Sequence, residues 1–156
     1  MSDRPSRTRV LFLCTGNSCR SQMAEGWARA LKSDLIEPYS AGIEKHGLNP
    51  RAVRVMREAG VDITGQRSKT VEELGDVQFD IVITVCGHAD EHCPTFVGAS
   101  SVVHIGFDDP PALAKDAVDE EQALSHFRRV RDEIREFVLG LPKSARSQSL
   151  TGPTDR

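Results

Sequence analysis

The sequence lacks the features that mark several classes of protein. Near the N-terminus the longest apolar run, Val10 to Leu13, is too short for a signal peptide or a membrane span. The formal net charge of −3 is not the basic balance of a general nucleic-acid-binding protein. Cysteine occurs four times, and a domain of 156 residues needs no disulfide framework. We therefore expect a cytoplasmic protein with no nucleic-acid or membrane partner, whose cysteines are catalytic, redox-active or metal-binding thiols.

The composition and the hydrophobic pattern predict one α/β domain. Hydrophobic residues make up 38% and charged residues 28%, which is enough apolar material for a core. Short strand-like runs alternate with helical patterns, and this alternation is typical of a parallel sheet with right-handed crossovers. We predict a single domain with a four-stranded parallel sheet and helices on both faces. The expected limits are residues 9–139, with flexible tails at 1–8 and 140–156 and a linker over 111–119. The expected strands are 9–13, 36–40, 79–85 and 101–105, and the expected helices are 20–32, 49–60 and 120–139.

The loops that follow the predicted strands contain the residues with the most distinctive chemistry. Ligands of such sheets bind beyond the carboxyl ends of the strands. Three loops leave strand ends here, at 14–18, 86–93 and 106–111. The four cysteines lie in or next to the first two of these loops.

Residues 14–21, which read Cys-Thr-Gly-Asn-Ser-Cys-Arg-Ser, have the features of an anion-binding loop. A loop between a strand and a helix turns backbone N–H groups inward, at the positive end of the helix dipole. Gly16 and Asn17 tolerate left-handed backbone, which a tight cradle needs. Arg20 can bind a tetrahedral oxyanion with a two-pronged hydrogen bond, and the same donors favour the thiolate of Cys14. We predict Cys14 as the nucleophile. The predicted substrate-binding residues are Thr15, Gly16, Asn17, Ser18, Cys19, Arg20 and Ser21.

Residues 14–25 resemble the oxyanion loop of the thioredoxin-coupled arsenate reductases, which share their fold with the low-molecular-weight protein tyrosine phosphatases. The resemblance continues through 39–42, 46–50 and 107–110 and reaches 127–134 in the last predicted helix. It therefore covers most of residues 9–139.

The resemblance implies an arsenate reductase of arsenic detoxification, with arsenate as substrate and phosphate or sulfate as other anions that fit the loop. It implies that the aspartate directly before proline, Asp109, donates the proton to the leaving oxygen. It also implies a relay in which Cys14 forms an adduct with arsenate, Cys86 attacks Cys14 to release arsenite, and Cys93 attacks Cys86. No bound cofactor is then needed, and thioredoxin is the external reductant.

Two other interpretations compete for the cysteines. Cys86, His88, His92 and Cys93 are all possible zinc ligands. Structural zinc sites favour paired ligands of the Cys-x2-Cys type, however, and the side chains of adjacent residues such as 92 and 93 diverge on a helix, so we predict no metal. A non-catalytic sensor that binds arsenite through three thiols is the second alternative, but no DNA-reading element accompanies it.

A phosphatase is the strongest competing enzyme, because the same loop and acid hydrolyse phosphate esters. A phosphotyrosine pocket needs aromatic walls, whereas Asp109-Pro110 is followed by Pro111-Ala112. Trp27 is expected on the core face of its helix, and a phosphatase has no use for a second pair of cysteines. We therefore expect weak phosphatase side activity.

One departure from the family pattern concerns a cation. Some relatives bind potassium beside the loop, and Asn17, Glu25 and Ser40 match that site. The acidic position that completes it is Lys69 here, whose ammonium group would repel the ion and could pair with Glu25 instead. We expect potassium to have little effect. The sequence assigns no role to His46 or to the two histidines at 88 and 92, and no catalytic step to Cys19.

Overall fold

Four parallel strands form one sheet in the computed structural model, which describes residues 7–85, 101–143 and 145. Their order across the sheet is β2-β1-β3-β4, so the first strand lies in the middle. This confirms the predicted four-stranded parallel sheet. The strands are β1 (Thr8–Cys14), β2 (Ile36–Gly42), β3 (Ile81–Thr84) and β4 (Ser101–His104).

The α-helices follow the predicted pattern, with one addition. Helix α4 spans Glu120–Leu139, as its apolar stripe indicates. Helix α3 (Pro110–Ala114) was expected to be linker, but its two prolines occupy the first helical turn, where the fixed φ of proline favours a helix. No helix in the described part of the chain is both long and apolar enough to cross a membrane. The others are α1 (Arg20–Leu31), α2 (Pro50–Glu58) and the 3₁₀ helix η1 (Val71–Leu74).

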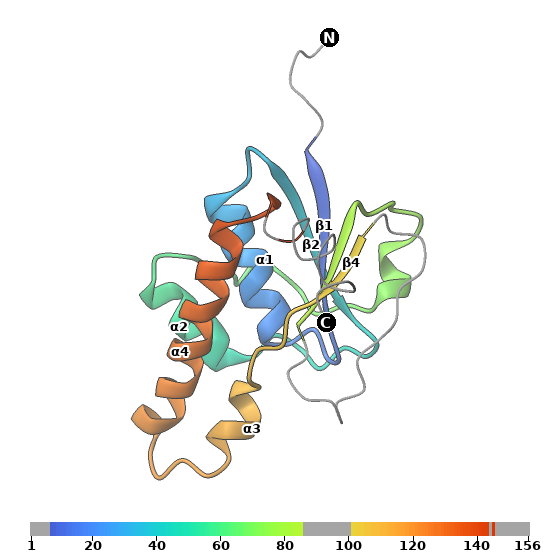
Figure 1. Cartoon of the computed structure of the whole chain (residues 1–156). Helices are drawn as coiled ribbons and strands as arrows, with labels where there is room; N and C mark the ends of the chain where they lie inside the picture. The colour runs from blue at the N-terminus through green and yellow to red at the C-terminus, as the bar shows by residue number, and fades with distance from the viewer. Residues whose placement is uncertain (1–6, 86–100, 144, 146–156) are drawn as a thin grey trace, which may run out of the picture.

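The two faces of the sheet are covered unequally (Figure 1). Alternate residues of β1 point to opposite faces, as the period of a strand requires. Val10 and Phe12 pack with the apolar faces of α1, α2 and α4 in the larger core cluster. Leu11 and Leu13 belong to a smaller cluster, against which residues of η1 pack. Helical structure therefore lies on both faces, with the α-helices of the described residues on one of them.

The apolar core continues to the end of the described chain. Leu141 and Ala145 are 1% and 0% exposed and belong to the same cluster as α4. The expected limits of the domain, 9–139, and the flexible tails beyond them stay predictions, because the outermost residues are not described.

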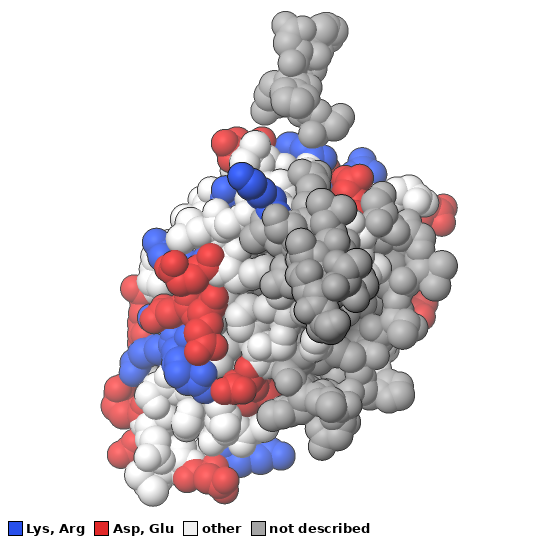
Figure 2. Space-filling view, in the orientation of Figure 1, with Lys and Arg blue, Asp and Glu red and all other residues white. Residues whose placement is uncertain are grey.

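The outer helices are joined by ion pairs. Arg51 of α2 pairs with Glu120 of α4 at 2.8 Å, and Arg128 of α4 pairs with Glu58 of α2 at the same distance. Figure 2 shows basic and acidic side chains next to one another on the face in view. The described part of this face therefore has no broad area of one charge.

All the strands run in the same direction, so their carboxyl ends meet at one edge of the sheet. Cys14 at the end of β1 is in register with Gly42 of β2, and Thr84 of β3 with His104 of β4. The loop after β1 and the segment between β4 and α3 leave from this edge. The loop at 86–93 also follows a strand, but it lies outside the described residues.

Phe127 in the middle of α4 tests the packing of the larger cluster, because its side chain is 0% exposed. Phe127→Ala should lower the free energy of unfolding by about 3–5 kcal/mol, since it removes buried apolar surface and leaves a cavity. Guanidinium chloride titrations followed by circular dichroism would measure the change. Val118→Ala is the control: this side chain is 83% exposed, so the free energy should change by less than about 0.5 kcal/mol. Equal losses in both variants would contradict this packing.

Candidate active site

The loop from Cys14 to Arg20 turns its carbonyl groups away from its centre. The backbone N–H groups of Glu44 and His46 donate to the carbonyl oxygens of Thr15 and Gly16, both at 3.0 Å. Asn49 N–H donates to Ser18 O at 3.0 Å. In a trans peptide the next N–H points opposite to the carbonyl, so these bonds turn the N–H groups of residues 16, 17 and 19 inward. Within the described residues these N–H groups have no protein acceptor, which is the condition for an anion cradle.

Asn17 holds the back of the loop. It has φ of 48°, the left-handed backbone predicted for it, and its side chain is fully buried. Its Oδ1 accepts from Lys69 N–H at 2.8 Å and from Gln22 Nε2 at 3.0 Å. Its Nδ2 donates to the Ser21 hydroxyl at 2.9 Å. Asn17 therefore shapes the loop from behind.

Gly16 meets a different requirement from the one predicted, because its φ is not in the left-handed region. A Cβ atom on Gly16 would lie 2.3 Å from His46 Nδ1. Glycine is needed at this position because the imidazole ring packs directly on the loop.

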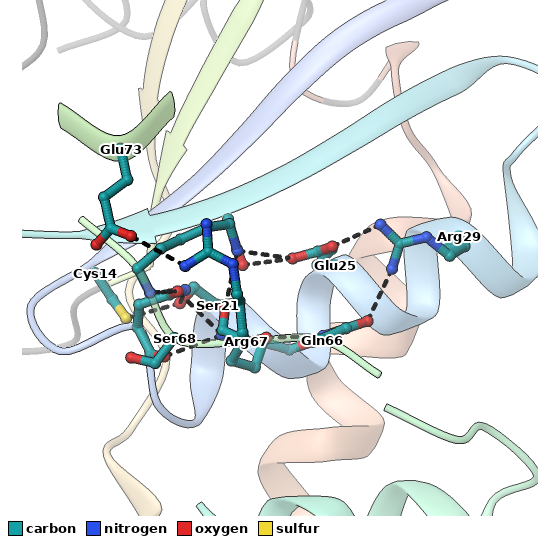
Figure 3. A network of polar contacts seen from close by, with 12 residues as sticks. Cys14, Ser21, Glu25, Arg29, Gln66, Arg67, Ser68 and Glu73 are labelled. Atoms are coloured by element: carbon teal, nitrogen blue, oxygen red, sulfur yellow. Dashed lines mark hydrogen bonds and ion pairs between the residues drawn. The ribbon is translucent and has the colours of Figure 1, made fainter. Parts of the chain in front are cut away.

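Ser21 contacts the sulfur of Cys14. The distance from Ser21 Oγ to Cys14 Sγ is 2.9 Å, and both residues are buried. Because Asn17 Nδ2 donates to the same hydroxyl, the Ser21 proton is free to point at the sulfur. The chain of hydrogen bonds from Asn17 through Ser21 favours a negative charge on Cys14. Figure 3 shows the contact between Ser21 and Cys14.

Arg20 connects the loop with the ends of two other strands. Its Nη1 donates to Phe107 O at 3.0 Å and to Val85 O at 3.4 Å, and the residue is 5% exposed. Its Nη2 lies 3.7 Å from Asp109 Oδ1. Among the described residues, the carbonyls of Phe107 and Val85 thus hold the guanidinium at the pocket.

The two adjacent aspartates differ in their surroundings. Asp108 pairs with Arg129 of α4 at 2.9 Å, and its side chain is 52% exposed. The side chain of Asp109 is 29% exposed, and its Oδ1 lies 3.7 Å from Arg20 Nη2. Asp109 lines the pocket and Asp108 does not.

A pocket of about 400 Å³ opens over the loop. It brings together seven of the predicted residues. Asn17 and Ser21 lie behind the loop instead. His46, Asn49 and Pro111 also line the pocket, and none of them was predicted as a site residue. For His46 and Asn49 the motif His-Gly-Leu-Asn-Pro at 46–50 was the available signal. The predicted residues in the lining are Cys14, Thr15, Gly16, Ser18, Cys19, Arg20 and Asp109.

Cys19 is the second thiol of the pocket. Burial raises the pKa of the Cys19 thiol well above its usual value, and nearby Cys14 and Asp109 raise it further against the opposing effect of Arg20. Cys19 therefore stays protonated at neutral pH.

The other two cysteines, Cys86 and Cys93, lie outside the described residues, as do His88 and His92 of the zinc interpretation. Among residues 7–85, 101–143 and 145, no group of three His, Cys, Asp or Glu side chains could hold a metal ion.

Lys69 lies beside Glu25, one of the residues that match the cation site expected from the resemblance. Its Nζ is 3.8 Å from Glu25 Oε1, an oxygen that also accepts from the Ser40 hydroxyl. The other Glu25 oxygen pairs with Arg29 (Figure 3). Burial lowers the pKa of Lys69, and Glu25 partly opposes this shift. The predicted pairing of Lys69 with Glu25 is confirmed, and an ammonium group at this carboxylate does not fit a potassium site.

The segment from Gln66 to Thr70 fixes Lys69 against the loop. Gln66 bonds with Gln22 and Arg29, and the Ser68 hydroxyl donates to Gly16 O at 3.1 Å. Glu73 closes the segment: the Thr70 backbone, Arg67 and Lys45 bond to its carboxylate and lower its pKa to about 2.

Comparison with known proteins gives relatives along nearly the whole chain. Residues 9–150 match the family described as low molecular weight phosphotyrosine protein phosphatase. A protein of Bacillus licheniformis named arsenate reductase is 52% identical over 133 residues, which are 85% of this chain and 94% of that protein. The arsenate reductase of Halalkalibacterium halodurans is 51% identical over 80% of this chain and 88% of its own. A solved structure described as an arsenate reductase in the phosphate binding state aligns with a TM-score of 0.73 and 35% identity, over 88% of this chain and 98% of that one.

The Lys69–Glu25 pair predicts how the protein responds to potassium. At equal ionic strength, replacing sodium with potassium should leave the melting temperature of the wild type unchanged, because Lys69 supplies the positive charge. Lys69→Asp should lower the melting temperature in sodium and recover part of the loss in potassium, since two carboxylates then face each other. Differential scanning fluorimetry measures both. Lys69→Met, which adds no carboxylate, is the control and should not respond to potassium. A wild type that melts several degrees higher in potassium would contradict the assignment.

Proposed function

The chain belongs to the low molecular weight phosphotyrosine protein phosphatase family, and we propose that this arsenate reductase binds arsenate in the loop of residues 14–20 and attacks it with Cys14. The observation that carries the proposal is the pocket itself. Cys14, Arg20 and Asp109 line one cavity over a loop with inward N–H groups. These are a nucleophile, an oxyanion clamp and a proton donor.

In the first step the Cys14 thiolate attacks arsenic in line with the leaving oxygen. The loop N–H groups and Arg20 hold the other oxygens and stabilise the charge that develops on them. A sulfur–arsenic bond forms and an arsenic–oxygen bond breaks. Asp109 gives its proton to the leaving oxygen, which departs as water.

In the second step a thiol of the same chain releases arsenite. We assign this step to Cys86, which attacks the Cys14 sulfur; the electron pair of the sulfur–arsenic bond moves to arsenic, which leaves as arsenite. A Cys14–Cys86 disulfide remains. Cys93 then attacks Cys86, restores the Cys14 thiolate and leaves a Cys86–Cys93 disulfide. The position of Cys86 in the sequence supports this assignment, because Cys86 directly follows Val85, whose carbonyl accepts a hydrogen bond from Arg20.

An external dithiol must reduce the Cys86–Cys93 disulfide, and we assign this role to thioredoxin. The two electrons that reduce arsenic come from the cysteines, so the proposed cycle uses no flavin, nicotinamide or metal. A cycle that starts from free thiols requires a reducing compartment, which supports the expected cytoplasmic location.

A weak phosphatase activity on small esters follows from the same pocket. The nucleophile, the arginine and the acid also fit phosphate ester hydrolysis. The pocket lining contains Pro111 as an apolar residue, however, and no Phe, Tyr or Trp of the described residues lines the pocket. Aromatic esters therefore gain little binding energy from the walls.

Cysteine variants test the order of the relay. With thioredoxin, thioredoxin reductase and NADPH, arsenate-dependent NADPH oxidation should fall to background in Cys14→Ser, Cys86→Ser and Cys93→Ser. In a single turnover without reductant, Cys93→Ser should still release arsenite, because the first exchange needs Cys86, whereas Cys86→Ser should release none. Hydrolysis of p-nitrophenyl phosphate is the control and should be lost in Cys14→Ser alone. Full turnover by Cys86→Ser would exclude this relay.

The adjacent aspartates provide a matched pair for the acid. Asp109→Asn should lower kcat about 100-fold or more, because the leaving oxygen loses its proton donor. Asp108→Asn should stay close to the wild type, since Asp108 pairs with Arg129 outside the pocket. Steady-state arsenate reduction under the same coupled conditions compares the two. Similar losses in both variants would mean that the turn, rather than the Asp109 carboxyl, matters.

A further inference from the structure

His46 lies at the mouth of the anion pocket, on a segment tied to the loop. The backbone N–H groups of Glu44, His46 and Asn49 all donate to loop carbonyl oxygens. His46 and Asn49 both line the pocket. The His46 side chain is 52% exposed, whereas Cys14 is 4% exposed. The imidazole therefore borders the entrance and the cysteine the base.

Two contacts fix the orientation of the imidazole. His46 Nε2 lies 2.6 Å from Glu44 Oε1, and because a carboxylate only accepts, this ring nitrogen is the one that carries a proton. The opposite edge of the ring rests on Gly16: a Cβ there would lie 2.3 Å from Nδ1, nearer than to any other ring atom. Nδ1 therefore faces the anion loop, and in the neutral ring it has a free lone pair.

A lone pair at this position distinguishes oxyanions by their hydroxyl groups. Inorganic arsenate and phosphate keep at least one hydroxyl at neutral pH, and this hydroxyl is a hydrogen-bond donor. A phosphate monoester has a second pKa of about 6, so at pH 7.5 it is mostly a dianion without a hydroxyl. Sulfate also lacks one, although its size and shape match those of phosphate.

We propose that His46, oriented by Glu44, is a specificity-determining residue that accepts a hydrogen bond from the substrate hydroxyl at Nδ1 and so selects inorganic arsenate and phosphate over monoesters and sulfate. This inference deepens the proposed function and rests on it for the identity of the substrate. The selection itself is a property of binding, so it can be measured without turnover.

The decisive experiment compares anions that differ in the hydroxyl. Isothermal titration calorimetry at pH 7.5 would measure the dissociation constants of inorganic phosphate, sulfate and phenyl phosphate on the Cys14→Ser chain, which cannot turn over. His46→Ala should raise the dissociation constant of phosphate about tenfold, which is the loss expected for a hydrogen bond to a charged ligand. The dissociation constants of sulfate and phenyl phosphate should stay within about twofold of their values without this substitution. Glu44→Ala should also raise the dissociation constant of phosphate, but by a smaller factor. His126→Ala on α4, outside the pocket lining, is the control and should change none of the three.

A second perturbation displaces the ring without removing it. Gly16→Ala introduces a methyl group that collides with the imidazole, so it should lower the preference for phosphate over sulfate as His46→Ala does. In the His46→Ala background the same methyl group meets no ring, and the preference should change no further. A double-mutant cycle therefore isolates the position of the imidazole.

The results separate this proposal from the proposed function. If His46→Ala lowered the affinities for phosphate and sulfate equally, the proposal would be overturned, because the imidazole would then act through charge or packing. An additive effect of Gly16→Ala in the double variant would overturn it as well. With Cys14 restored, His46→Ala should raise the KM for arsenate more than it lowers kcat. A wild type that selects phosphate over sulfate through His46 but does not reduce arsenate would contradict the proposed function alone.

Discussion

The pocket depends on the direction of a few peptide groups. The carbonyls of Thr15, Gly16 and Ser18 accept hydrogen bonds from the segment of residues 44–49, and this turns the following N–H groups to the centre of the loop. Asn17 holds the same loop from behind through Ser21 and Lys69. The protein's own hydrogen bonds fix these N–H groups, so anion binding needs little reorganisation of the backbone. Preorganised donors of this kind are the largest source of oxyanion stabilisation in enzymes.

Arg20 links the anion-binding loop to the ends of two other strands at this edge of the sheet. As a buried cation it must be hydrogen-bonded, and the carbonyls of Val85 and Phe107 meet that requirement. These two residues follow β3 and β4, so one side chain links the carboxyl ends of three strands. It also lies 3.7 Å from Asp109. In the proposed mechanism the substrate and the proton donor therefore share a single guanidinium.

The Lys69–Glu25 contact puts a covalently attached positive charge where the resemblance led us to expect a cation site. In the described structure Glu25 is 6% exposed and is bonded by Ser40, Arg29 and Lys69. A buried carboxylate needs such partners. Because the ammonium group belongs to the chain, we expect the support for the loop not to depend on the ionic composition of the solution.

The sequence by itself determined the local structure around the site. Strand, loop and helix over residues 9–32, the cap at Asn49, the helix at 120–139 and the roles predicted for Cys14 and Arg20 follow from periodicity, caps and residue types within short windows. The four-stranded parallel sheet also follows, because alternating strands and helices permit few topologies. Only the tertiary structure decided which of Asp108 and Asp109 lines the pocket, that Gly16 is needed for the ring of His46, and that Asn17 and Ser21 act from behind the loop. Those outcomes depend on contacts between segments distant in sequence, such as Arg129 with Asp108 and His46 with Gly16, and no local pattern encodes a contact of that kind.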